Sequence, residues 1–293
     1  MLRGGSLAPA LFYLEQPAAK DLYPRTFSRV AAAYKRRLDE VMARGEAHGR
    51  AAVIEWIDPA PGKRIVDLAC GPGTLSYPLA QAVAPGGEVV GIDLAPGMIE
   101  LAQREAPPGL PVRFEVMDME DLRFPDHSFD AAVSGHGFQF VPDLRRALSE
   151  TRRVLKPGSR MAASVPVDPS QPSDAQAILE RAVGGALPPA PKPRDQFATR
   201  RMVEDEETFA DVARRAGFST VEVVRYEEST TWSSPRHFIE MSSSWWSMAL
   251  RLDQVSPSER TALLERARDA IEAELGLGPL QIAGATNVLR AIA

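Results

Sequence analysis

A glycine-rich turn follows the first strongly apolar run of the chain. The run Arg64–Ala69 leads into Cys70-Gly71-Pro72-Gly73-Thr74. Glycines let a backbone approach a ligand closely, and a helix that starts after such a turn presents unpaired N–H groups with partial positive charge. The turn is therefore predicted to bind a carboxylate or a phosphate.

Two acids near this turn narrow the choice of ligand. Asp93 ends the next apolar run, 20 residues after Gly73, where an acidic side chain accepts hydrogen bonds from two ribose hydroxyls. A dinucleotide turn would place a third glycine where this chain has Ser76. Asp67 has no role against a pyrophosphate, but it would help to orient the ammonium of an adenosyl amino acid. These two departures favour S-adenosylmethionine and make a nicotinamide oxidoreductase the least favoured alternative.

Two further positions complete the predicted ligand site. Asp118, just beyond the third run, is expected to accept the exocyclic amine of adenine, while the backbone N–H of Met119 meets a ring nitrogen. Ser134 and Gly135 end the fourth run, where the backbone can close over the methionine portion. All four positions lie at predicted strand ends, which is where open α/β sheets bind ligands.

Candidate residues for the chemistry and for the acceptor are fewer. His136 is predicted as a general base for an acceptor that must lose a proton, the alternative being a packed histidine. Gln139 is predicted to orient the acceptor or to bind backbone. The segment 232–248 is rich in aromatic residues, so Trp245 and Trp246, together with Phe138, are predicted to contact the acceptor. The alternative is that these rings pack in a core.

The elements that position these residues alternate between strand and helix. This rhythm predicts a parallel sheet with helices on both faces. The predicted strands are Arg64–Ala69, Glu88–Asp93, Val112–Met117, Phe129–Ser134, Arg160–Val165, Val221–Tyr226 and Leu280–Ile292. The predicted helices are Thr26–Arg44, His48–Ile57, Thr74–Ala84, Pro96–Glu105, Asp143–Leu155, Glu206–Ala216, Pro235–Leu252 and Pro257–Leu275, and Lys156-Pro157-Gly158 is predicted as a turn.

Four regions follow from this pattern. Residues 1–60 form an N-terminal arm, loose over 1–22, and two helices, and residues 61–167 form the cofactor-binding core. Residues 168–205, rich in proline and serine, are expected to be a loop or lid excursion. Residues 206–293 complete the sheet and carry a helical cap insert over 235–276.

Composition limits the classes of function. The formal charge of −5 and the pI near 5.6 give no reason to expect a nucleic-acid partner. The single cysteine excludes an intramolecular disulfide and a cysteine-based zinc cluster, and no metal is expected. No apolar run is long enough to span a membrane, and no secretory signal is visible, so we expect a cytoplasmic protein. Arginine pairs such as Arg152-Arg153 are expected on solvated helix faces.

The chain resembles the class I S-adenosylmethionine-dependent methyltransferases, in the group that includes ubiquinone and menaquinone biosynthesis enzymes. The resemblance is carried by segments 65–74, 90–98, 118–125, 128–130 and 155–158. It implies a Rossmann-like, doubly wound sheet of seven strands, mostly parallel with an antiparallel last strand, and helices between strands six and seven. It also implies cofactor contacts from Tyr34, Asp67, Ala69, Gly71, Pro72, Gly73, Asp93, Leu94, Met98, Asp118, Met119 and Ser134. In that family, Leu94 and Met98 would flank the adenine and Tyr34 would close over the cofactor.

The sequence thus predicts methylation of oxygen or carbon on a small, hydrophobic or aromatic metabolite. The Asn-Pro-Pro-Tyr type of motif that marks amino-group methylases is absent after the fourth strand, where Ser134-Gly135-His136-Gly137 stands instead. One alternative is an enzyme of the same fold that uses the bound sulfonium for a cyclisation, decarboxylation or rearrangement. Another is a binding or regulatory protein with a degenerate cofactor site, which the intact Asp67 and Asp93 disfavour. The oligomeric state stays open.

Overall fold

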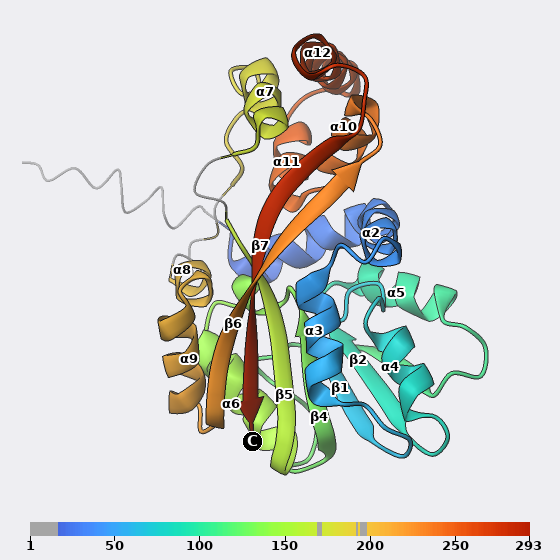
Figure 1. Ribbon diagram of the computed structural model, residues 1–293, viewed down its shortest axis with the longest axis vertical. Coiled ribbons are helices and arrows are strands. Elements are labelled where there is room, and N and C mark those ends of the chain that lie inside the picture. The colour runs from blue at the N-terminus through green and yellow to red at the C-terminus, as the bar shows by residue number, and fades with distance from the viewer. Residues whose placement is uncertain (1–16, 169–171, 192, 194–197) are drawn as a thin grey trace, which may run out of the picture.

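A single seven-stranded sheet organises the protein (Figure 1). The computed structural model describes residues 17–168, 172–191, 193 and 198–293. The strands lie in the order β3-β2-β1-β4-β5-β7-β6, with β1 to β5 parallel and β7 antiparallel to both of its neighbours. Their bounds are β1 Arg64–Leu68, β2 Glu88–Asp93, β3 Val112–Val116, β4 Phe129–Gly135, β5 Leu155–Val167, β6 Ser219–Trp232 and β7 Leu280–Ile292. The predicted Rossmann-like sheet with an antiparallel last strand is confirmed.

Helices cover both faces of the sheet. On one face, α3 (His48–Ile57) and α4 (Ser76–Val83) pack on Ile65, Val89 and Val133. On the other, α6 (Leu144–Val154), α8 (Thr199–Glu204) and α9 (Glu206–Arg215) pack on residues such as Val66 and Leu289. Helix α5 (Pro96–Glu105) contacts β2, β3 and α2 (Ala19–Ala43). Because the central strands are buried on both faces, their sequences are continuous apolar runs rather than alternating ones.

Local signals fix where several of these helices begin. Pro96 occupies the first turn of α5, where its missing N–H costs no hydrogen bond. The side chains of Asp143 and Asp205 accept hydrogen bonds from backbone N–H groups at the starts of α6 and α9. Because Pro96 favours a helix start at this point, α5 begins just past the end of β2, where Asp93 lies.

Helix α2 begins earlier than predicted. We expected a loose arm over 1–22 and a helix from Thr26, but residues 19–25 are already helical and include Pro24. Residues 1–16 lie outside the described part of the chain. Burial of Ala19 and Tyr23, and ion pairs from Lys20, explain why the helix continues through a proline that would weaken an isolated one.

The region expected as a loop or lid contains two helices. Within 168–205, the structure has α7 (Asp174–Val183) and α8. Ser173 and Gln176 form a capping box that starts α7, a signal that the proline-rich surroundings masked. Helix α7 packs on α12 (Pro257–Leu275), so part of this region belongs to the cap.

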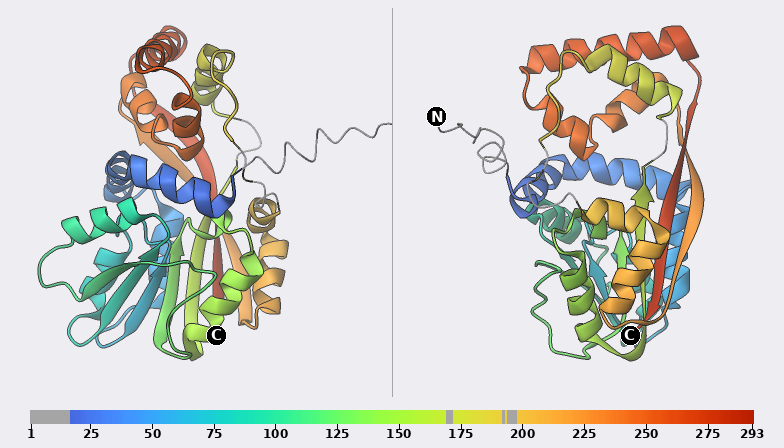
Figure 2. Two further views of the ribbon diagram at one scale, coloured as in Figure 1. Left: turned by 180° about the vertical axis from the view of Figure 1, so that it is seen from behind. Right: turned by 90° about the vertical axis from the view of Figure 1, so that its left-hand side faces the viewer.

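A helical cap stands beyond the carboxyl ends of the parallel strands, with α2 between the cap and the sheet (Figure 2). It consists of α7, α10 (Pro235–Ser242), α11 (Trp246–Leu252) and α12, which share a core that includes Ile178, Phe238 and Ile271. Strands β6 and β7 extend past β5 as an antiparallel ribbon that carries the cap.

The helix predicted over Pro235–Leu252 is two helices. The chain breaks at Ser243-Ser244-Trp245, where Ser243 Oγ donates to Glu240 O and Ser244 Oγ to Met241 O, both at 2.6 Å. Serine hydroxyls compete for helix carbonyls in this way and weaken a helix interior. As a result, Trp245 and Trp246 start a separate helix.

Strand β5 is also longer than predicted, because the turn expected at Lys156-Pro157-Gly158 is an irregularity within the strand. Leu155 pairs with Phe129 and Arg160 pairs with Ala131, with a register shift between them. Gly158 takes a φ of 79° there. Among the described helices, none has the length and apolar character that crossing a bilayer requires.

Candidate functional site

Two adjoining cavities lie at the carboxyl ends of the parallel strands. The larger, here called the main cavity, holds about 780 Å³ including its open mouth. The smaller, here called the side cavity, holds about 270 Å³. Tyr34, Ala69, Gly71 and Gly135 line both. One elongated ligand can therefore extend from one cavity into the other past these shared residues.

Asp67 of β1 lines the side cavity and is fully buried. Its Oδ2 accepts a hydrogen bond from the Ser76 hydroxyl at 2.6 Å, and its Oδ1 has no hydrogen-bond partner among the described residues. Burial raises the pKa of Asp67 to about 7, against the opposing effects of Ser76 and Arg50. A buried carboxyl group with an unused oxygen suits a cationic ligand group in this cavity.

Arg50 of α3 supplies a positive charge in the same cavity, and the sequence analysis missed it. The residue is buried, and its Nη2 donates to the hydroxyl of Tyr34 at 3.4 Å. A signal was present, because Arg50 shares a helix face with the buried Val53 and Ile57 at three- and seven-residue spacing. The side cavity therefore holds a carboxyl group and a guanidinium group together, which suits the ammonium and the carboxylate of an amino acid.

Asp93 lines the main cavity, and the backbone holds its carboxylate in place. Its Oδ2 accepts from the N–H of Gly71 at 2.9 Å, and its Oδ1 accepts from the N–H of Ala95 at 2.8 Å. Burial raises its pKa, although these backbone hydrogen bonds oppose the shift. Leu94 and Met98, from the same strand end and from α5, line the cavity beside it. Each carboxylate oxygen keeps acceptor capacity for a ligand hydroxyl.

The glycine-rich turn brings backbone to both cavities. Gly71 takes a φ of 54°, and no atom lies within 4 Å of the position that a Cβ would occupy, so the turn leaves room for a ligand. Ala69 also has a positive φ, 55°, which is uncommon for a residue with a side chain. Pro72 lines the side cavity. Gly73 lines neither cavity; a Cβ there would lie 2.7 Å from the ring of Tyr77.

Asp118 and Met119 line the main cavity at the end of β3. One oxygen of Asp118 accepts from the N–H of Glu120 at 2.9 Å, and the other pairs with Lys20 Nζ at 2.6 Å. Lys20 also pairs with Glu120 at 2.5 Å. The first turns of α2 are thereby tied to the acids beyond β3.

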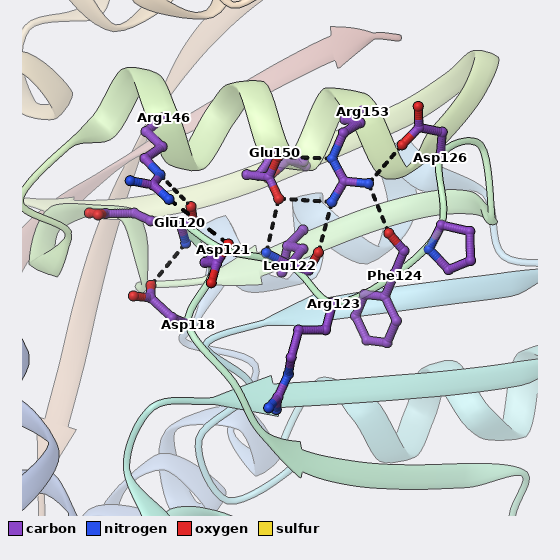
Figure 3. A network of polar contacts seen from close by, with 12 residues as sticks. Asp118, Glu120, Asp121, Leu122, Arg123, Phe124, Asp126, Arg146, Glu150 and Arg153 are labelled. Carbon is purple, nitrogen blue, oxygen red and sulfur yellow. Dashed lines mark hydrogen bonds and ion pairs between the residues drawn. The ribbon is translucent and has the colours of Figure 1, made fainter.

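An arginine of α6 organises the loop that carries Asp118 (Figure 3). Arg153 donates to the carbonyl oxygens of Leu122 and Phe124 at 2.7 and 2.8 Å, and it pairs with Glu150 at 2.8 Å. Glu150 in turn accepts from the N–H of Leu122 at 2.9 Å. Arg153, which was expected on a solvated helix face, is half-buried there, and its guanidinium also satisfies carbonyls that the loop leaves unpaired.

The end of β4 and the turn after it bring some side chains to the main cavity and bury others beneath it. His136 lines the main cavity between Gly135 and Gly137. Ser134 and Phe138 are fully buried and line neither cavity, and Phe138 belongs to the core under α6. Phe140, two residues later in the short helix η1 (Phe138–Phe140), lines the main cavity instead.

Gln139 is buried and does not line the main cavity. Its Nε2 donates to the carbonyl oxygen of His136 at 2.8 Å, which matches the backbone-binding alternative of the sequence analysis. His136 itself has a φ of 63°, and its N–H donates to Ser164 O at 2.9 Å. The bond from Gln139 thus helps to fix the position of His136.

The electrostatic surroundings of His136 keep its ring neutral. Burial lowers its pKa well below the usual range, and the positive charges of Arg50, Arg37 and Arg200 add to this effect. Its Nε2 is buried without a hydrogen-bond partner in the described ranges. A histidine of this kind accepts a hydrogen bond readily but is a weak base.

Aromatic rings form one wall of the main cavity. Tyr23, Phe27 and Phe140 line it, and the ring centroid of Phe140 lies 4.9 Å from Tyr23 and 5.1 Å from Phe27, in edge-to-face arrangements. The two tryptophans predicted to bind the acceptor do not line this cavity. Trp246 packs behind the wall, 5.4 Å from Tyr23. Trp245 lines a separate cleft between α7 and α11.

Comparison with known sequences agrees with this geometry. The methyltransferase domain family matches residues 65–158. The nocamycin O-methyltransferase of Saccharothrix syringae is 31% identical over 242 residues, covering 78% of this chain and 84% of that protein. The demethylmenaquinone methyltransferase of Thermus thermophilus is 48% identical over 113 residues, 38% of this chain and 50% of that enzyme. The 2-phytyl-1,4-naphtoquinone methyltransferase of Synechococcus elongatus is 34% identical over 147 residues, 49% of this chain. The chain spans 63% of that relative's length.

Solved structures share the fold at low sequence identity. The YcgJ protein of Bacillus subtilis aligns with a TM-score of 0.54 at 18% identity, covering 84% of this chain and 97% of that one. Phosphoethanolamine N-methyltransferase 2 of Haemonchus contortus, solved with S-adenosyl-L-methionine, aligns with a TM-score of 0.51 at 19% identity, covering 83% and 51%. The nocamycin O-methyltransferase is matched over most of its length, and the cavities and strand-end acids agree with that match, so the chain belongs to the class I S-adenosylmethionine-dependent methyltransferases.

Proposed function

We propose that this protein transfers a methyl group from S-adenosylmethionine to oxygen or carbon of a small, hydrophobic or aromatic acceptor. The observation that carries the proposal is the pair of joined cavities, one with opposite charges and one with a fixed carboxylate and apolar walls. The names of the relatives, which refer to naphthoquinone, demethylmenaquinone and nocamycin, agree with an acceptor of this class.

The residues of the side cavity fit the amino-acid end of the cofactor. Asp67, with its unpartnered Oδ1, would accept from the ammonium, and Arg50 would pair with the carboxylate. Gly71 and Pro72 would place backbone beside this end, and Gly135 would take the part expected of Ser134. Tyr34, which lines both cavities, would close over the junction.

The residues of the main cavity fit the adenosine end. Asp93 would accept from the ribose hydroxyls, since Gly71 and Ala95 already hold its carboxylate in position. Leu94 and Met98 would contact the adenine faces. Asp118 and the N–H of Met119 would bind the adenine edge, with the loop of Figure 3 holding them in place.

When bound, the cofactor supplies a methyl group on a positively charged sulfur, activated for in-line displacement. The chain's own contribution is alignment and exclusion of water. Tyr23, Phe27 and Phe140 would cover the site with apolar surface. The neutral ring of His136 would accept a hydrogen bond from the acceptor. Gln139 would hold His136 in place by donating to its backbone carbonyl oxygen.

The test is incubation of the purified protein with S-adenosylmethionine and a panel of phenols, enols and hydroquinones. Mass spectrometry should find one acceptor that gains a methylene unit, with formation of adenosylhomocysteine in equal amount. An acceptor that is converted without this gain would support the non-methylating alternative. Absence of both products, together with absence of cofactor binding, would refute the proposal.

A further inference from the structure

Lys20 of α2 links two walls of the main cavity that are far apart in the chain. Its Nζ lies 2.6 Å from Oδ2 of Asp118 and 2.5 Å from Oε2 of Glu120. Lys20 and Asp118 both line the main cavity, and Glu120 is buried. One ammonium group therefore holds two acids of the loop after β3 to the first turn of α2.

Glu120 is a fixed anchor for this ammonium group. Its Oε1 accepts from the N–H of Asp143 at 2.9 Å. Its carbonyl oxygen accepts from Nε of Arg146 at 2.7 Å (Figure 3). Both donors lie at the start of α6. Loss of Lys20 would leave Oε2 of a buried carboxylate without this ion pair, which is costly.

The segment that Lys20 anchors, residues 19–27 of α2, is weakly held by its own backbone. No side chain caps the helix at Ala18, and Pro24 has no N–H to donate to the carbonyl oxygen of Lys20. The segment nevertheless supplies Tyr23 and Phe27 to the aromatic wall of the main cavity. The position of this wall therefore depends on contacts with other elements, and the ion pairs of Lys20 are such contacts.

Phe27 connects the same segment to the proposed adenine site. It packs against a small core cluster that includes Ala95 and Met98. Met98 of α5 lines the main cavity, where it would contact the adenine. One short segment thus adjoins both the adenosine end of the cofactor site and the wall proposed for the acceptor.

We propose that Lys20 is a positioning residue for methyl transfer: its two ion pairs hold residues 19–27 against the loop after β3 and so close the aromatic wall over the bound cofactor. Lys20 acts through Tyr23 and Phe27, which it places, rather than on the reacting atoms. Because the cofactor would leave when this segment moves away, Lys20 should slow cofactor release. This inference rests on the proposed function.

The test measures amide hydrogen exchange and cofactor release in the full-length protein. With adenosylhomocysteine at saturation, Lys20→Met should speed exchange in residues 21–27 about tenfold, since the segment opens more often. Exchange in β1 should stay unchanged, which shows that the fold is intact. The dissociation rate of adenosylhomocysteine, measured by surface plasmon resonance, should also rise about tenfold. Lys20→Arg should restore most of both properties, because it keeps the charge and the donors.

Lys35→Met is the matched control. Lys35 lies on the same helix and also pairs with two acids, Asp39 and Glu105, but it lines neither cavity. Its loss should leave exchange in residues 21–27 and cofactor release unchanged.

Wild-type exchange of residues 21–27 in Lys20→Met would overturn the inference, and so would faster exchange without faster release. Equal effects of the Lys20→Met and Lys35→Met variants, or no recovery in Lys20→Arg, would also overturn it. Failure of the wild-type protein to bind adenosylhomocysteine would instead refute the proposed function.

Discussion

Replacing Asp67 by asparagine tests whether the side cavity holds the amino-acid end of the cofactor. The carboxyl group is fully buried, bonded to Ser76 through one oxygen, and has a pKa of about 7. An ammonium group binds the ionised carboxylate far better than the protonated acid. Cofactor affinity should therefore rise with pH as Asp67 ionises.

The size of the effect follows from the pKa. At pH 5.5 roughly 3% of Asp67 would be ionised, and at pH 7.0 about half, so the affinity should increase about 15-fold across this interval. The ammonium of the ligand stays mostly protonated over the same range, because α-amino groups titrate near pH 8. Adenosylhomocysteine, which carries the same amino-acid end, is titrated by calorimetry at constant ionic strength. Asp67→Asn should bind weakly at every pH, with a nearly flat profile.

Stability provides a second readout on the same carboxyl group. Because the folded protein binds this proton more tightly than the unfolded chain does, the contribution of Asp67 is largest below about pH 4 and is lost as the pH rises through about 7. The loss could reach about 4 kcal/mol in the ligand-free protein, and Asp67→Asn should lack it. A wild-type affinity that stays constant between pH 5.5 and 7.0, or an equally steep profile in the variant, would refute the assignment.

Three other substitutions test separate parts of the account. Asp93→Ala should weaken adenosylhomocysteine binding by about 1–3 kcal/mol in calorimetry, and unchanged affinity would contradict the ribose assignment. Arg153→Ala should lower the free energy of unfolding by about 1–3 kcal/mol in denaturant titration, since three loop groups and Glu150 of α6 lose a charged partner. Arg152→Ala, which removes only a 3.3 Å bond to Gly217 O, is the control, and equal losses would refute the role of Arg153. Trp246→Ala should raise the KM of the acceptor more than that of the cofactor by loosening Tyr23, and equal changes would argue against an aromatic acceptor wall.

Much of the fold could be predicted because its signals are local. The apolar runs that contain Asp67 and end at Asp93 are strands β1 and β2, which are buried on both faces, and the alternating run before Asp118 is β3, whose residues are mostly half-buried. Signals that depend on distant contacts were weaker. Helix α7 has its own capping box, but its place in the cap depends on α12, about 80 residues further along the chain. The start of α2 depends on Lys20 meeting acids beyond β3.

The limits of the site prediction have a similar cause. Each strand-end acid follows from where its strand stops, and the structure places all three in the cavities. Beyond β4, a turn of a few residues decides which side chain faces the cavity, so Phe140 rather than Phe138 reaches it. Arg50 carries a helix-face signal in the sequence, but its place in the site depends on how α3 packs next to α2, which the sequence does not show.

Calorimetric titration of the wild-type protein with adenosylhomocysteine and, separately, with NAD at pH 7 is the most direct measurement of the central claim. The joined cavities, with Asp67 and Arg50 at one end and Asp93 at the other, should bind adenosylhomocysteine at a single site and leave NAD unbound. Binding of NAD, or no heat of binding from adenosylhomocysteine, would contradict it.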